Sequence, residues 1–166
     1  MTDPSGWNIS CELNFSFVRS INGILKSCHV VLGLIAFILI LSYSPAKYLD
    51  GTYAGIACTK SAAFFLLVSY SFLVISFLVF FCSLLSYHTA STLPKTAFEL
   101  TYHVIACFMY IIASLTLMIV LIKDNQNPLS QLIKDPGYNG KVAASVFGVM
   151  NSIVYGISIF LTIRSR

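Results

Sequence analysis

The sequence predicts an all-α membrane protein in which four helices cross the bilayer as a bundle. Hydrophobic residues make up 57% of the chain and charged residues only 10%, which is too apolar for a soluble domain. Polar segments separate four apolar runs, each long enough for the roughly 20 residues that a spanning helix needs. Because these runs take up most of the 166 residues, we expect no separate soluble domain.

The first spanning helix is predicted over residues 24–44, at the start of a transmembrane domain that covers residues 23–163. Residues 1–22 are polar and mixed, and are interpreted as a short tail without the period of a helix. The apolar run could instead be a signal peptide, because Ser42-Tyr43-Ser44 is a small-x-small sequence of the kind that signal peptidase cuts. The length of the run and the acidic residues before it favour a spanning helix.

The second spanning helix is predicted over residues 61–87, after a connection that begins at Pro45. This run is longer than an upright helix requires, so the helix should tilt or extend past the headgroups. Ser69, Ser76 and Ser83 recur every seven residues, which indicates one polar helix face.

A turn around Pro94 leads to the third spanning helix, predicted over residues 97–122. A longer polar connection follows, in which residues 129–133 favour one short amphipathic turn on the membrane surface. The fourth spanning helix is predicted over residues 142–163, and the arginines of the tail at residues 164–166 should anchor it among the headgroups.

Four spanning helices place both chain ends on the same side of the membrane, but charge does not indicate which side. Lys and Arg number five on the tails plus the middle loop and five on the other two loops. Asn8 and Asn14 each begin an Asn-x-Ser glycosylation sequence, which accepts a glycan only if the N-terminal tail is lumenal.

Small residues at four-residue steps along the fourth run predict a helix-packing face: Ala144, Gly148, Ser152 and Gly156. A row of small side chains lets two helices approach closely, and van der Waals packing is a main source of helix association in lipid. The row either packs inside the bundle or offers a face to a partner protein or a second copy of the chain.

A polar cluster is predicted where the first and third spanning helices enter the membrane from the same side. Lys26 and His29 lie near the start of the first helix, and Glu99 and His103 near the start of the third. A lone charge in a spanning segment is expensive, so we expect Lys26 to pair with Glu99. The alternative is that each group reaches headgroups or water separately. A proton relay would need titrating groups through the whole membrane, whereas these lie at one face.

Two further kinds of polar residue lie in or near the spanning helices. Asn151, near the middle of the fourth, is expected to hydrogen-bond a neighbouring helix. Cys11, Cys28 and Cys82 are candidates for palmitoylation if they face the cytosol near the interface, although a buried structural cysteine is the more frequent case.

Composition and motifs exclude several classes of function. The formal net charge of +4 is spread thinly, so no nucleic-acid surface is expected. The five cysteines stand at irregular spacings, which argues against a disulfide framework or a zinc site. No catalytic motif is found, and the spanning helices lack the charge rings of selective pores and the glycine and proline breaks of many transporters. We expect neither an enzyme nor a bound cofactor or metal.

The order of parts resembles the MARVEL-domain superfamily, nearest the chemokine-like-factor-like MARVEL transmembrane or MAL-like proteins. The resemblance covers residues 17–163 and rests on the opening segment 17–26, the third-helix segment 102–114, and the fourth-helix segment 141–150 followed by Tyr155. The most specific piece is Ala-Ala-x-x-Phe-Gly within that fourth-helix segment.

The resemblance implies a four-helix bundle with both tails cytosolic, in the plasma membrane or transport vesicles. It also implies a role in vesicle traffic, cholesterol-rich membrane organisation, cell junctions or membrane fusion, and it supplies no catalytic residues. Some relatives have paired cysteines in their extracellular loops, whereas here only Cys58 lies in either such loop, which makes a loop disulfide doubtful.

The favoured interpretation is a non-enzymatic protein that organises or traffics membrane by lateral packing with lipid, including cholesterol, with other integral membrane proteins, and with a second copy of itself. One alternative is a transporter or channel subunit that uses the polar cluster of Lys26, His29, Glu99 and His103. Another is a junction or fusion component that acts through its loops, especially residues 123–141.

Overall fold

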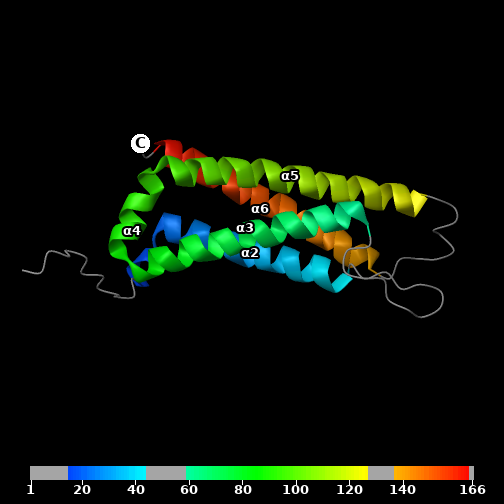
Figure 1. Ribbon diagram of the computed structural model, residues 1–166, viewed down its shortest axis with the longest axis horizontal. Helices are drawn as coiled ribbons and strands as arrows, with labels where there is room; N and C mark the ends of the chain where they lie inside the picture. The colour runs from blue at the N-terminus through cyan, green and yellow to red at the C-terminus, as the bar shows by residue number, and fades with distance from the viewer. Residues whose placement is uncertain (1–14, 44–58, 127–136, 165–166) are drawn as a thin grey trace, which may run out of the picture.

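The fold is an antiparallel bundle of four long helices, seen in a computed structural model that describes residues 15–43, 59–126 and 137–164 (Figure 1). Those helices are long and apolar enough to cross a membrane. The predicted fold class is therefore confirmed, and the chain is a multi-pass membrane protein. The bundle consists of α2 (Ile21–Tyr43), α3 (Lys60–Leu85), α5 (Ala97–Gln126) and α6 (Tyr138–Arg164).

The direction of the helices brings distant parts of the sequence to one end of the bundle. Helices α2 and α5 run in one direction, and α3 and α6 run in the other (Figure 1). Helix α6 packs against both α5 and α2, and α3 packs against α2 and α5. The start of α2, the start of α5 and the end of α6 consequently lie at the same end.

The expectation that the segment before residue 23 has no helix was wrong. A short helix, α1 (Phe15–Val18), precedes α2, which itself begins at Ile21. Phe17 is buried, and the Ser20 hydroxyl donates to its carbonyl oxygen (2.6 Å) while accepting from the backbone N–H of Gly23 (3.1 Å). Gly23 is required at this corner because a Cβ there would overlap the Phe17 carbonyl. Local hydrogen bonding and one buried ring therefore order this segment.

The connection between α3 and α5 is helical, where the sequence predicted a turn. It consists of α4 (Tyr87–Thr92) and the 3-10 helix η1 (Leu93–Lys95), and α4 lies across the end of the bundle (Figure 1). Ser86 explains why α3 stops before residue 87. Its backbone is extended, and its hydroxyl accepts from the backbone N–H of Thr89 (3.3 Å), so it ends α3 and caps α4.

The interior of the bundle combines aromatic side chains with many small polar ones. Fully buried Phe65, Tyr110 and Tyr155 pack there beside serines of α3 and α6. Large apolar side chains such as Phe108 and Phe160 instead point outward. This distribution suits a lipid solvent, in which apolar surface has no reason to be hidden and polar groups must find partners inside.

Candidate functional site

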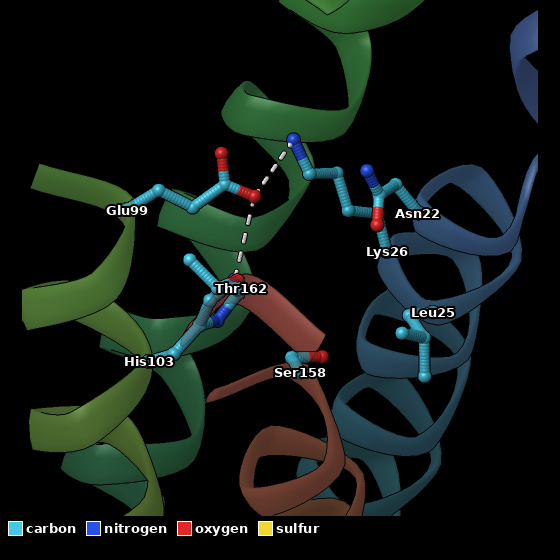
Figure 2. A pocket seen from close by; sticks show the side chains of 7 residues that line it. All are labelled: Asn22, Leu25, Lys26, Glu99, His103, Ser158 and Thr162. Carbon is cyan, nitrogen blue, oxygen red and sulfur yellow. Dashed lines mark ion pairs between the residues drawn. The ribbon is translucent and has the colours of Figure 1, made fainter. Parts of the chain in front are cut away.

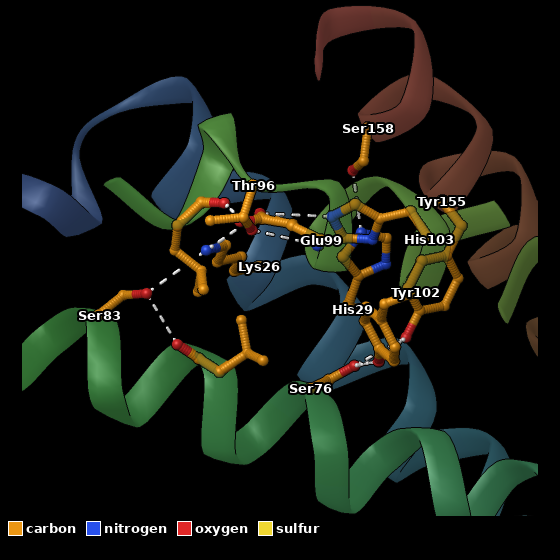
Figure 3. A network of polar contacts seen from close by, with 12 residues as sticks. Lys26, His29, Ser76, Ser83, Thr96, Glu99, Tyr102, His103, Tyr155 and Ser158 are labelled. Atoms are coloured by element: carbon orange, nitrogen blue, oxygen red, sulfur yellow. Dashed lines mark hydrogen bonds and ion pairs between the residues drawn. The ribbon is translucent and has the colours of Figure 1, made fainter. Parts of the chain in front are cut away.

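Three of the ionisable side chains predicted to cluster are in direct contact at the end of the bundle near α4 (Figures 2 and 3). The Nζ atom of Lys26 lies 3.1 Å from Oε1 of Glu99. Nε2 of His103, one helical turn after Glu99, lies 3.4 Å from the same oxygen. All three side chains are almost completely buried. Removing either charge alone would leave the other uncompensated in a medium of low polarity.

The ammonium group of Lys26 also reaches α3, so that one side chain joins the first three spanning helices. Its Nζ donates to the hydroxyl oxygen of Ser83 (3.4 Å), which in turn donates to the carbonyl oxygen of Val79 (2.8 Å). The same Nζ lies 5.8 Å from the centre of the Phe17 ring in α1, a distance suited to a cation–π contact.

His29, the fourth predicted member, lies deeper and binds α6 instead of Glu99. Its Nδ1 lies 3.3 Å from Oδ1 of Asn151, and its Nε2 lies 3.0 Å from the hydroxyl of Ser158. The amide oxygen can only accept, so Nδ1 donates to it, whereas the one proton of the Ser158 hydroxyl is shared between Nε2 and the carbonyl oxygen of Val154 (3.1 Å). The ring also stacks on Tyr155 at 3.8 Å between centroids and lies 5.5 Å from the His103 ring. The rings of His29 and His103 thus bring the two parts of the cluster next to each other.

A group of three hydroxyls, which sequence reasoning missed, continues the polar interior (Figure 3). The Ser76 hydroxyl lies 2.6 Å from that of Tyr102 and 2.7 Å from that of Tyr155, and the two phenolic oxygens are 3.0 Å apart. Tyr102 also donates to the carbonyl oxygen of Phe72 (3.2 Å). The seven-residue serine period indicates a polar face on α3, but it does not identify the side chains that this face contacts.

Asn151 continues the polar interior beyond His29. It is fully buried, its side-chain oxygen lies 3.3 Å from His29, and its Nδ2 has no hydrogen-bond partner in the described part of the chain. Gly33 leaves room for it, because a Cβ at Gly33 would lie 3.6 Å from Nδ2 of Asn151 and 3.4 Å from the hydroxyl of Tyr110. Nearer the other end of the bundle, apolar Leu117 and Phe65 fill the interior.

The predicted row of small residues does not form one uniform surface. Ala144, Gly148 and Ser152 are buried in the bundle, and a Cβ at Gly148 would overlap the Ser114 hydroxyl and the Phe65 ring. A Cβ at Gly156 would meet nothing within 4 Å. The first three residues therefore permit close helix approach inside the bundle, whereas Gly156 lies beside open space.

Two of the three cysteines predicted as palmitoylation candidates lie among the described residues. Cys28 is half-buried on α2, and Cys82 is exposed one turn before the end of α3. Several predictions fall outside the described residues and concern Asn8, Cys11, Asn14, Cys58 and the amphipathic turn at residues 129–133.

The chemistry available at this site is hydrogen bonding and charge pairing. Within residues 15–43, 59–126 and 137–164, no group of three or more His, Cys, Asp or Glu side chains is arranged to hold a metal ion. Four buried polar atoms lack a hydrogen-bond partner in this part of the chain, among them Oε2 of Glu99 and Nδ1 of His103. The cluster thus fastens helices together and retains unused acceptor capacity.

The chain matches the model of one known protein family. The family model MARVEL, described as a membrane-associating domain, matches residues 17–161, almost the whole chain. No curated protein and no solved structure gives a significant match.

Proposed function

Because the chain belongs to the MARVEL family of membrane-associating domains, we propose that it organises or traffics membrane by packing its helices laterally against partner membrane proteins and lipid. In this proposal it is not an enzyme, both termini are cytosolic, and it resides in the plasma membrane or in transport vesicles. Its processes are vesicle transport, membrane apposition or fusion, cell junctions, or cholesterol-rich domains, and its partners include cholesterol and a second copy of the chain.

The observation that carries the proposal is the contrast between the interior of the bundle and its outer surface. The ionisable and hydroxyl groups inside largely satisfy one another across α2, α3, α5 and α6. The outward faces carry large apolar side chains along every spanning helix, for example Leu67, Phe108 and Phe160. A bundle that is fixed internally and apolar externally offers its outer faces for lateral association, which in lipid depends on shape.

The test is a rescue experiment in cells that lack the protein. We expect newly made membrane proteins to reach the surface more slowly in such cells, measured by pulse labelling and surface biotinylation, and the intact chain to restore the rate. The variant Phe108→Leu/Phe160→Leu keeps the outer face apolar but changes its shape, so it should insert normally and restore the rate poorly. An unchanged surface proteome and vesicle distribution in the cells without the protein would contradict the proposal.

The polar cluster supports a second candidate, a transporter or channel subunit. Lys26, His29, Glu99 and His103 line the interior from one end, but Phe65 and Leu117 fill the interior nearer the opposite end. Ion flux into liposomes containing the purified chain, abolished by Glu99→Gln, would favour this candidate over membrane organisation.

A third candidate acts through the loops. Replacing residues 123–141 should then abolish adhesion or fusion while surface delivery of the protein stays intact. Failed delivery after this replacement would favour the trafficking role instead.

A further inference from the structure

We propose that the pocket between α2, α5 and α6 binds the primary ammonium group of an ethanolamine phospholipid. The pocket lies at the end of the bundle near α4, and Lys26, Glu99 and His103 form part of its wall (Figure 2). This inference deepens the proposed function by naming a lipid, and it rests on that function only in placing the chain in a bilayer.

The carboxylate of Glu99, at the pocket wall, has an oxygen without a hydrogen-bond donor in the described residues. Oε1 of Glu99 accepts from both Lys26 and His103, whereas Oε2 has no partner in the described part of the chain. Nδ1 of His103 also has no partner there. Buried acceptors without donors are unfavourable, so a donor should occupy this pocket.

The size of the pocket suits a primary ammonium group. The pocket has room for a group about as large as one water molecule. A primary ammonium is of that size and carries three N–H donors, which form short, charge-assisted bonds to a carboxylate. The trimethylammonium group of a choline lipid is larger and has no N–H donor. The pocket therefore discriminates between the two commonest kinds of zwitterionic headgroup.

The residues that line the pocket belong to the ends of the spanning helices. Asn22 and Lys26 belong to the first turns of α2, Glu99 to the first turn of α5, and Thr162 to the last turn of α6. The ends of spanning helices lie near the headgroups, and acyl chains lie deeper. The group that reaches this pocket from the bilayer is therefore part of a headgroup.

The charges in and around the pocket favour a zwitterionic lipid over a free amine. Lys26 already neutralises Glu99, so a free amine would enter a pocket without net negative charge. An ethanolamine lipid brings its own phosphate, and two exposed arginines belong to the same end of the bundle, Arg19 between α1 and α2 and Arg164 as the last residue of α6. A serine headgroup would add a carboxylate on the carbon that bears the ammonium, close to Oε2 of Glu99, the oxygen that has no donor in the described residues, and like charges repel at short range. Ethanolamine is consequently preferred to serine.

The experiment measures which lipid stays with the full chain. The protein is reconstituted in vesicles with equal amounts of ethanolamine, choline and serine phospholipids of the same acyl chains, then extracted in mild detergent and analysed by native mass spectrometry. We expect the ethanolamine lipid to be retained about tenfold more than the choline lipid, as one additional charge-assisted hydrogen bond would give.

Two variants and a matched control locate the retained lipid. Glu99→Gln removes the charge but disturbs the ion pair, so Leu25→Trp, at the half-buried pocket wall, blocks access without touching the pair. Leu34→Trp makes the same change at an exposed position of α2 away from the pocket. Selective retention should fall to the choline level in the first two variants and persist in Leu34→Trp.

Three results would overturn the inference. They are equal retention of ethanolamine and choline lipids by the unaltered chain, retention of the serine lipid at or above that of the ethanolamine lipid, and selective retention that survives in Leu25→Trp. The cell rescue separates this inference from the proposed function. Loss of lipid selectivity with full rescue by Leu25→Trp contradicts the lipid site as part of that function, whereas selectivity without any delivery defect contradicts the function alone.

Discussion

Gly148 is a residue at which α6 packs closely against α5 and α3. A Cβ placed there would overlap the Ser114 hydroxyl oxygen and lie 2.8 Å from a carbon of the Phe65 ring, which is fully buried. Gly148→Ala should lower the free energy of unfolding by about 1–3 kcal/mol, the usual effect of overpacking. Thermal unfolding in detergent, followed by circular dichroism, measures the change.

The matched control for this substitution is Gly156→Ala, two turns further along the same helix. No atom lies within 4 Å of the Cβ that it adds, so the melting temperature should stay the same or rise. Equal loss of stability in both variants would show that the close packing at Gly148 has no special role.

The ion pair between Lys26 and Glu99 can be tested by a double-mutant cycle. Replacing either residue by Met leaves one buried charge without its partner, which typically costs about 3–5 kcal/mol of stability. The variant Lys26→Met/Glu99→Met removes both charges, so its loss should be clearly smaller than the sum of the two single losses. Unfolding in increasing denaturant measures all three variants.

Lys123→Met, at an exposed position near the end of α5, serves as the control for loss of a lysine. It should change stability by less than about 0.5 kcal/mol. Additive losses in the cycle would contradict a favourable interaction between Lys26 and Glu99.

At the scale of the helix, the polar face of α3 distributes its serines among different partners. Ser83 accepts from Lys26, and Ser76 contacts the hydroxyls of Tyr102 and Tyr155. Ser76→Ala should destabilise the bundle by about 1 kcal/mol, because the two phenols keep only their contact with each other and the one to the backbone. Ser71→Ala, exposed on the same helix, should have little effect. Identical melting curves for the two variants would contradict the prediction.

Helix periodicity explains why one sequence pattern predicted interior contacts better than another. At about 3.6 residues per turn, a seven-residue repeat drifts only about 20° per step, so Ser69, Ser76 and Ser83 all remain buried. A four-residue step drifts about 40°, so Gly156 stands about 120° around the helix from Ala144. The row of small residues therefore leaves the interior before its end.

The fold could be predicted because four long apolar runs leave few alternatives, and the short helices could not. Helix α1 depends on the burial of Phe17, and α4 depends on the cap at Ser86, both of which are local details without an apolar period. The ionisable part of the cluster could be named because lone charges in lipid are costly. The hydroxyl partners could not, since the sequence does not give the rotation of one helix against another.

At the scale of the whole molecule, Lys and Arg are equally numerous on the two sides of the bundle, even when buried lysines are left out. Lys26 and Lys141 are both buried and lie on opposite sides of the count, so leaving them out changes the balance from five against five to four against four. A direct measurement of topology is therefore needed.

We predict that Asn8 and Asn14 carry no glycan in cells and that an antibody reaches a tag at residue 130 without permeabilisation. The reason is the proposed cytosolic placement of both termini, and the start of α2 and the end of α6 lie at the same end of the bundle (Figure 1). Glycosidase-sensitive mobility of the chain, together with a tag reached only after permeabilisation, would invert the bundle in the membrane.

The contacts of the polar interior also set an order for the biosynthesis of the protein. Lys26 belongs to the first spanning helix, its acceptor Ser83 to the second, and its counter-ion Glu99 to the third. The hydrogen-bond partners of His29 are synthesised last, because both of them are in the last helix. A nascent chain emerging from the ribosome therefore carries unmatched polar groups until translation is almost finished. Insertion of this protein into the membrane is complete only when α6 has joined the helices made before it.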